Sequence, residues 1–166
     1  MAAVSLQPRP NPSQHLPIPR VALVTSVYNE RYTDGLLASC QTEFLSIYPE
    51  AHLTSLRVPG AFEIPVVLGR LLTEGSFHAA IALGVIFRGD TAHADLVGSS
   101  VTEALQRLAV STGKPVIHEV LLLEGDAEAK ERCLGERINR GTEAARVAAS
   151  MIDLMAQLPS VLPTAR

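Results

Sequence analysis

Short apolar runs alternate with segments of helical periodicity along this chain, and this alternation limits its possible folds more than any other feature. Three apolar runs, at residues 20–27, 79–87 and 115–123, indicate strands buried in a sheet, and the alternating pattern of residues 52–58 predicts a fourth strand. Between and after them, apolar residues recur every three or four positions, which predicts helices at 32–44, 64–72, 92–111, 126–133 and 139–158. Strict alternation predicts a parallel sheet with helices on both faces. We therefore expect a three-layer α/β/α sandwich around a four-stranded parallel sheet.

Length and composition favour one globular domain. A chain of 166 residues that is 47% hydrophobic can bury a sizeable core. The net charge of −3, without a basic cluster, argues against nucleic acid as a partner. No apolar run reaches the ~18 residues of a membrane span, so we expect no membrane partner. Since the amino-terminal segment lacks the apolar stretch of a signal peptide, the expected location is cytoplasmic. Neither Cys40 nor Cys133 belongs to a Cys-x-x-Cys pair, so both are expected to be buried free thiols.

The expected domain occupies residues 20–158 and has the architecture called flavodoxin-like. Residues 1–19 contain five prolines, a density that excludes a helix or a central strand and predicts an extended N-terminal arm. The arm is either a disordered tail or a segment that lies on a neighbouring subunit. Residues 159–166 are expected to form a C-terminal tail.

The polar stretch Arg88–His93 lies between the third expected strand and the helix that follows it. A glycine-containing turn at this point of a parallel α/β sheet is where ligands bind, and the free amides of a helix start attract anions. Asp90 and Thr91 can cap the helix, and His93 can move a proton near neutral pH. The spacing resembles a P-loop, but Asp90 stands where a P-loop has lysine, which argues against a nucleotide. The stretch predicts an anion pocket beside an acid/base group.

Two more polar stretches follow expected strands. Tyr28 and Asn29 come after the first strand, where the ring either stacks on a flat heterocycle or packs the loop, and the amide either contacts a ligand or caps a helix. Glu63 belongs to the stretch 59–65, which begins with a Pro-Gly turn. Its carboxylate either contacts a ligand or offsets the positive start of the next helix.

The last polar group lies near the carboxyl end of the chain. Arg132 can bind a phosphate with its planar guanidinium, although surface arginines are common. Arg140 and Glu143 are spaced i, i+3 on an expected helix, which suggests a simple surface ion pair.

In this order and spacing, four motifs resemble the 6,7-dimethyl-8-ribityllumazine synthase family: residues 59–65, 84–93, 115–117 and 139–145. The resemblance extends over about residues 21–155. It implies condensation of 5-amino-6-ribitylaminouracil with 3,4-dihydroxy-2-butanone 4-phosphate, which gives 6,7-dimethyl-8-ribityllumazine, phosphate and water in the penultimate step of riboflavin biosynthesis. It also implies no metal and no organic cofactor. The two small-molecule substrates would bind between neighbouring subunits of a homopentamer, and some members assemble twelve pentamers into a capsid.

The resemblance also implies roles for individual residues. His93 corresponds to the histidine that transfers protons, and Tyr28 to an aromatic residue that stacks on the pyrimidine. The phosphate of the butanone would contact Asp90, Thr91 and Arg132. The loop that holds the ribityl chain and ring corresponds to Ala61, Phe62 and Glu63. The strand end whose backbone binds the pyrimidine edge corresponds to Val85, Ile86 and Phe87. Asn29, Arg140 and Glu143 correspond to further polar positions of the site. His118 corresponds to a residue in the wall that the neighbouring subunit contributes.

Departures from the family pattern leave a second function open. Tyr28 replaces a Phe or Trp, His118 replaces a common Phe, and Arg140 replaces a Lys. These changes bear on substrate affinity, and the alternative is a weakly active or inactive paralogue that binds a flavin or lumazine or acts as a scaffold. The prolines of the arm, and residues 134–138 without a glycine-rich kink, favour an isolated pentamer over a capsid.

Overall fold

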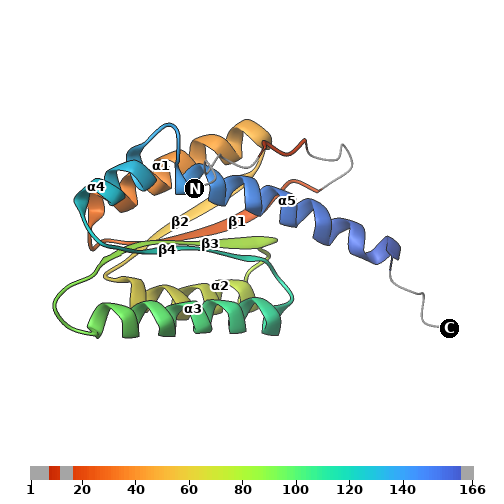
Figure 1. Ribbon diagram of the computed structural model, residues 1–166. Coiled ribbons are helices and arrows are strands. Elements are labelled where there is room, and N and C mark those ends of the chain that lie inside the picture. The colour runs from red at the N-terminus through yellow and green to blue at the C-terminus, as the bar shows by residue number, and fades with distance from the viewer. Residues whose placement is uncertain (1–7, 12–16, 162–166) are drawn as a thin grey trace.

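The computed structural model describes residues 8–11 and 17–161 and contains the expected three layers (Figure 1). The strands β1 (Arg20–Ser26), β2 (His52–Val58), β3 (Ala79–Phe87) and β4 (Val116–Leu123) form one sheet in the order β2-β1-β3-β4. All neighbouring strands pair in parallel. On one face lie α1 (Glu30–Ile47), the short α4 (Asp126–Ala129) and α5 (Arg140–Val161), and on the other α2 (Ile64–Glu74) and α3 (His93–Thr112). The predicted α/β fold is confirmed.

The two central strands divide the hydrophobic core into two halves. Successive side chains of a strand point to opposite faces. Val21 and Leu23 of β1 accordingly pack into the cluster under α1 and α5, whereas Ala22 and Val24 pack into the cluster over α2 and α3. The strands β2 and β4 are the edges of the sheet. The edge strand β4 therefore has one side without a strand partner among the described residues.

Most expected boundaries are met within two or three residues. The expected helix at 126–133 is divided, because one α-helical turn is followed by a π-helical segment, Lys130–Leu134. Helix α5 continues to Val161, although Pro159 falls in its last turn. Residues 159–161 of the expected tail are therefore helical, and 162–166 lie outside the described residues. In the described part of the chain, each helix is too short or too polar to cross a membrane.

The described part of the N-terminal arm is bound to its own subunit. Arg9 forms a bidentate pair with Glu43 of α1, with both nitrogen–oxygen distances 2.8 Å. Glu43 is 7% exposed and also accepts a hydrogen bond of 2.7 Å from Nε of Arg146 on α5. The hydrogen bond from Arg9, with further help from Arg146, lowers the pKa of the Glu43 carboxyl below its ordinary value. Residues 1–7 and 12–16 of the expected arm lie outside the described residues.

Candidate active site

A pocket of about 590 Å³ opens at the carboxyl ends of β1 and β3. This is the end of a parallel sheet where α/β folds bind ligands, and the volume is in the range of small-molecule sites. Four segments form its walls: the turn after β1, the 3-10 turn before α2, the end of β3, and the first turns of α3. The residues that line it are Tyr28, Asn29, Gly60, Ala61, Phe62, Glu63, Val85, Ile86, Phe87, His93, Ala94 and Val97.

Asn29 joins two of these walls. Its backbone is left-handed, with φ 61° and ψ 40°, a conformation that Asn adopts more readily than most residues. Of the two alternatives for the Asn29 amide, a side-chain cap on α1 is not formed, because the cap position makes no side-chain hydrogen bond. The Asn29 amide instead donates a 2.8 Å hydrogen bond to the carbonyl of Val85 at the end of β3. Asn29 therefore fixes the ends of β1 and β3 relative to each other.

Gly60 allows the turn before α2 to approach the turn after β1. The amide of Gly60 donates a 2.9 Å hydrogen bond to Oε2 of Glu63. A β-carbon at position 60 would lie 3.0 Å from that oxygen and 3.2 Å from the ring of Tyr28, closer than ordinary contact. The Glu63 carboxylate thus has the structural role expected of a helix start, and it also lines the pocket.

Two exposed aromatic side chains border the pocket. Tyr28 is 72% exposed and Phe62 is 61% exposed. Phe87 is instead held by the edge of Tyr32, with ring centroids 5.8 Å apart and an interplanar angle of 83°. Rings that can stack yet face solvent are suited to a flat heterocycle or to a partner surface.

His93 is the first residue of α3 and lines the pocket. The expectation that Asp90 and Thr91 cap this helix is wrong, since Ala92 is the N-cap residue and makes no side-chain cap bond. The Thr91 hydroxyl accepts only a long hydrogen bond, 3.4 Å, from the amide of His93. The start of α3 therefore keeps amide donors that an anion can use.

Arg88, in the same stretch, is engaged elsewhere. Its guanidinium pairs with Asp95 of α3 at 3.0 Å and with Glu124 after β4. Arg88 thus ties together the loops that follow β3 and β4, and it does not line the pocket.

Six residues expected at the site are not among those that line this pocket. Asp90 and Thr91 belong to the loop just before α3, and the other four lie beside the edge strand β4. Nε2 of His118 lies 2.8 Å from the hydroxyl of Thr102 on α3, and burial lowers the pKa of this histidine. The Thr102 hydroxyl thus satisfies one nitrogen of the His118 ring within the same subunit, as expected for a neutral histidine. Arg132 donates a 2.8 Å bond to Glu128, one helical turn before it. Arg140 and Glu143 lie at the start of α5.

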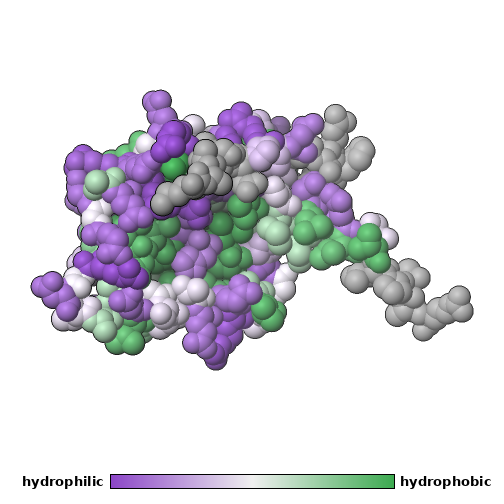
Figure 2. Space-filling model, viewed as in Figure 1, coloured by the Kyte–Doolittle hydropathy of each residue, from purple (hydrophilic) through white to green (hydrophobic). Residues whose placement is uncertain are grey.

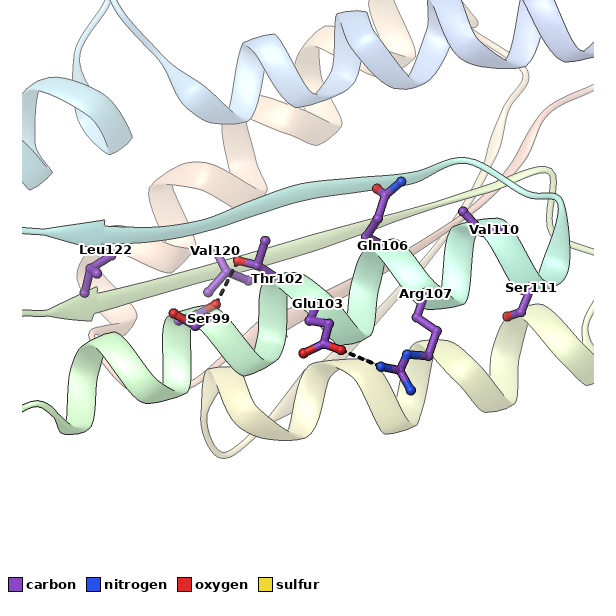
Figure 3. A pocket seen from close by; sticks show the side chains of 10 residues that line it. Ser99, Thr102, Glu103, Gln106, Arg107, Val110, Ser111, Val120 and Leu122 are labelled. Carbon is purple, nitrogen blue, oxygen red and sulfur yellow. Dashed lines mark hydrogen bonds and ion pairs between the residues drawn. The ribbon is translucent and has the colours of Figure 1, made fainter.

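A groove of about 900 Å³ runs between α3 and β4 on this side (Figure 3). Its walls include Gly98 and Thr102 of α3 and Val120 and Leu122 of β4. Figure 2 shows hydrophobic side chains gathered at the level of the sheet, between the two helical layers. The β4 side of the subunit thus combines a groove, an apolar band and several predicted site residues.

The expected surface pair of Arg140 and Glu143 forms, but it is buried and includes a third residue. Nε and Nη2 of Arg140 donate to the two carboxylate oxygens of Glu119, at 3.0 and 3.1 Å, and Nη1 donates to Glu143. Glu119 is 4% exposed and Glu143 is 6% exposed. Burial raises the pKa of Glu119 to about 7, although Arg140 opposes this. We call these three residues the Arg140 cluster.

The sequence analysis did not identify Glu119. A signal was present, because a carboxylate in the apolar run 116–123 is unusual, and the period-two alternation assigns it to the buried face with Ile117 and Leu121. Such a group requires a partner, and the only sequence clue to that partner was a distant arginine.

The neighbours of Arg140 in the motif 139–141 have structural roles. Oδ1 of Asn139 accepts a 3.0 Å bond from the amide of Thr142, and its Nδ2 donates to the carbonyl of Gly135 at 3.0 Å. A β-carbon on Gly141 would lie 2.9 Å from the carbonyl carbon of Leu36, so glycine lets α5 pack directly on the backbone of α1. Fold requirements therefore explain Asn139 and Gly141 but not the guanidinium between them.

Comparison with known proteins points to one family. The sequence model described as 6,7-dimethyl-8-ribityllumazine synthase matches residues 19–156. A protein of that name from Stenotrophomonas maltophilia (strain R551-3) is 37% identical over 141 residues, which is 84% of this chain and 91% of the relative. A protein of the same name from Xylella fastidiosa (strain M12) is 38% identical over 84% of this chain and 92% of the relative. Another from Xanthomonas oryzae pv. oryzae (strain PXO99A) is 38% identical over 86% of this chain and 94% of the relative.

Proposed function

The chain belongs to the 6,7-dimethyl-8-ribityllumazine synthase family, and we propose that its active site is shared between two subunits. It is a transferase of riboflavin biosynthesis, which condenses 5-amino-6-ribitylaminouracil with 3,4-dihydroxy-2-butanone 4-phosphate to give 6,7-dimethyl-8-ribityllumazine, phosphate and water. No observation on the chain favours the alternative of an inactive binding or scaffold paralogue. One half of the proposed site is the pocket at the ends of β1 and β3, and the other is the β4 side of a neighbour.

The observation that carries this proposal is that the pocket contains an acid/base group but no cation. No arginine or lysine is found among the described residues that line it. One substrate carries a phosphate, and phosphate is bound in proteins by cationic donors as well as by amides. Arg132 lies on the β4 side of the same subunit. A neighbour that turns its β4 side toward the pocket supplies the missing charge.

The proposed roles follow from the chemistry of the condensation. An amine attacks a ketone to form an imine, phosphate leaves, and ring closure releases water. His93 gives and takes the protons of these steps, which suits an exposed imidazole at the pocket wall. The amides at the start of α3, with Asp90 and Thr91 beside them, and Arg132 of the neighbour hold the phosphate until it leaves.

The pyrimidine occupies the rest of the pocket in this proposal. Tyr28 stacks on the ring, while Ala61, Phe62 and Glu63 hold the ring and the ribityl chain. The backbone of Val85, Ile86 and Phe87 contacts the pyrimidine edge, and Asn29 supports it from the Val85 carbonyl. His118 and the Arg140 cluster approach from the neighbour. Holding both substrates in register supplies much of the acceleration.

We propose a homopentamer as the assembly. A groove on the β4 side and solvent-exposed Tyr28 and Phe62 on the pocket side give each subunit two surfaces that suit a heterologous, ring-forming contact. An isolated pentamer is favoured over a capsid because Arg9 binds the arm to its own α1. Light scattering tests this directly, and a particle with the mass of twelve pentamers would contradict it. The cytoplasmic location expected from the sequence belongs to the same proposal.

Complementation between two impaired variants tests the shared site, at a butanone phosphate concentration below the raised KM of Arg132→Ala. Co-expression of His93→Ala with Arg132→Ala creates interfaces that combine an intact pocket from one subunit with an intact arginine from the other. We expect about a quarter of the sites in an equal random mixture to be complete, so product forms well above the mean of the two parents. Fluorescence of the lumazine product, with both substrates present, is the readout.

A matched pair provides the control. Co-expression of His93→Ala with Asn29→Ala alters the same half of the site twice, so no mixed interface is intact and activity stays at the parental level. No recovery in the test pair while mixed oligomers are present would show that His93 and Arg132 of one site belong to the same subunit. Recovery in the control would show that His93 and Asn29 act from different subunits, which would contradict the proposed division of the site.

A further inference from the structure

The Arg140 cluster joins two elements through one guanidinium. Glu119 comes from the middle of β4, Glu143 from the first turn of α5, and Arg140 lies between their carboxylates. Three of the five N–H donors of the guanidinium are used in these bonds, which leaves two. The Arg140 side chain is 32% exposed, so it is partly open to solvent on the β4 side.

A contribution to folding stability does not explain why a glutamate occupies position 119. Moving a carboxylate and a guanidinium out of water costs several kcal/mol per ion, and a well-packed apolar replacement is often equal or better. The neighbouring positions Ile117, Leu121 and Leu123 of the same strand are apolar. What a bidentate carboxylate adds is orientation, because the two parallel hydrogen bonds fix the plane of a planar cation that otherwise has many rotamers.

We propose that Glu119 is a positioning residue that holds the Arg140 guanidinium in one orientation for substrate binding. This inference rests on the proposed function, in which the β4 side of one subunit completes the pocket of the next. Glu119 itself is buried, so it acts through Arg140 and not by touching substrate.

The charge of the cluster indicates which substrate Arg140 contacts. Two carboxylates face one guanidinium, so the cluster does not offer a net positive charge to a phosphate. Arg132, by contrast, pairs with Glu128, and both of those side chains are partly exposed to solvent, which weakens the pairing. Arg140 is therefore suited to the hydroxyl and carbonyl groups of the ribitylaminouracil, and Arg132 to the phosphate of the butanone.

A double-mutant cycle tests the proposal. We expect Glu119→Gln to raise the KM for the ribitylaminouracil by about 10-fold, below the ~100-fold that a 1 Å misplacement can cost, with little change in the KM for the butanone phosphate. Arg140→Ala should raise the same KM, and adding Glu119→Gln to it should have no further effect. Independent, multiplicative effects would overturn the proposal.

Two further variants separate positioning from folding. Glu119→Leu removes the ion pair but fills the same volume, so it should melt at or above the temperature of the native protein while still raising the KM. Glu43→Gln is the matched control, since it also removes a buried carboxylate that two arginines contact, but away from β4. It should lower the melting temperature and leave both KM values unchanged. A Glu119→Leu protein with a native KM would refute positioning.

The pH profile gives an independent readout. The groups that act on the Glu119 carboxyl are Arg140 and Glu143 of α5 and Arg132 of the π-helical segment, and the buried thiols of Cys40 and Cys133 lie in its field. With a pKa of about 7, Glu119 is protonated and releases its bidentate hold as pH falls below 7. The KM for the pyrimidine should rise over that range in the native enzyme but stay flat in Glu119→Gln. An unchanged slope in the variant would contradict the inference.

The outcomes also distinguish a failure of the positioning role of Glu119 from a failure of the shared active site on which it rests. If Arg140→Ala changes neither KM, Arg140 is not at the site and the composition of the shared site is wrong. If Arg140→Ala raises the KM but Glu119→Gln does not, the shared site stands and the positioning role is wrong.

Discussion

Replacing Gly141 by alanine should disturb both the stability and the substrate affinity of this enzyme. The added β-carbon would lie 2.9 Å from the carbonyl carbon and 3.0 Å from the α-carbon of Leu36. These are backbone atoms of α1, which cannot turn away as a flexible side chain could. To reach an ordinary carbon–carbon separation of ~3.5–4.0 Å, α5 must move from α1 by about 1 Å.

The expected loss of stability is the difference between two effects. Overpacking of a tight contact costs about 1–3 kcal/mol. Alanine in place of glycine in a helix recovers at most about 1 kcal/mol, and less in the first turn. The net loss is then about 1–2 kcal/mol, and a domain of this size loses ~2–4 °C of melting temperature per kcal/mol. Gly141→Ala should therefore melt about 2–8 °C below the native protein.

The assay is thermal unfolding followed by circular dichroism at one fixed subunit concentration, because dissociation of an oligomer makes the midpoint concentration-dependent. Gly69→Ala is the matched control. It lies inside α2, and its β-carbon would meet only Leu108, at 3.9 Å, so helix propensity alone should raise the melting temperature slightly.

A functional consequence accompanies the structural one. Arg140 immediately precedes Gly141, so a shift of α5 also displaces the guanidinium from Glu119, and the KM for the pyrimidine substrate should rise. If Gly141→Ala melts as high as Gly69→Ala, the close approach of α5 to α1 does not constrain this position. Our account of the motif 139–141 would then be wrong.

Further predictions concern single residues of the site and the arm. His93→Ala should lower kcat by about 100-fold, typical of a lost acid/base group, and a native rate would remove His93 from the mechanism. Arg132→Ala should mainly raise the KM for the butanone phosphate, so a change confined to the pyrimidine KM would contradict the phosphate assignment. Because the folded-state pKa of Glu43 is lowered, its ionised form stabilises the protein above the ordinary carboxyl pKa of ~4.3, and this contribution is lost as pH falls through the lowered value. The difference in melting temperature between native protein and Glu43→Gln should accordingly shrink from pH 6 toward pH 3, and a constant difference would show that the Glu43 carboxylate is not held as a charge.

The fold was predictable from the sequence because its signal is local. Strand β3 is an apolar run and β2 alternates along its length, so both were predicted with their observed bounds. The prediction differed from the structure where packing between elements, and not the local sequence pattern, determines the backbone conformation. The periodicity of 126–133 does not reveal that α helix gives way to π helix at Lys130, where Gly35 of α1 packs against the backbone of Cys133.

The pocket was predictable for a related reason. Its residues follow successive strands, and parallel strands end at one edge of the sheet, so topology alone brings Tyr28, Glu63 and His93 together. The hydrogen bonds inside it were not predictable. Asn29 bonds to Val85 and not to its own helix because a left-handed backbone directs the side chain across to β3, and chain spacing contains no information on that choice.

The Arg140 cluster could not be predicted from the sequence. The spacing of Arg140 and Glu143 describes a pair along one helix, whereas the bidentate partner Glu119 is 21 positions away on a strand. Only the packing of α5 across the sheet, set by Gly141 on α1, brings them within hydrogen-bond reach. Among the described residues, those that line the pocket include His93 but no arginine or lysine, whereas Arg132 lies on another side of the same subunit. The proposed contact between neighbouring subunits brings the two together. In the proposed homopentamer, the contact between subunits is also the contact that completes the active site.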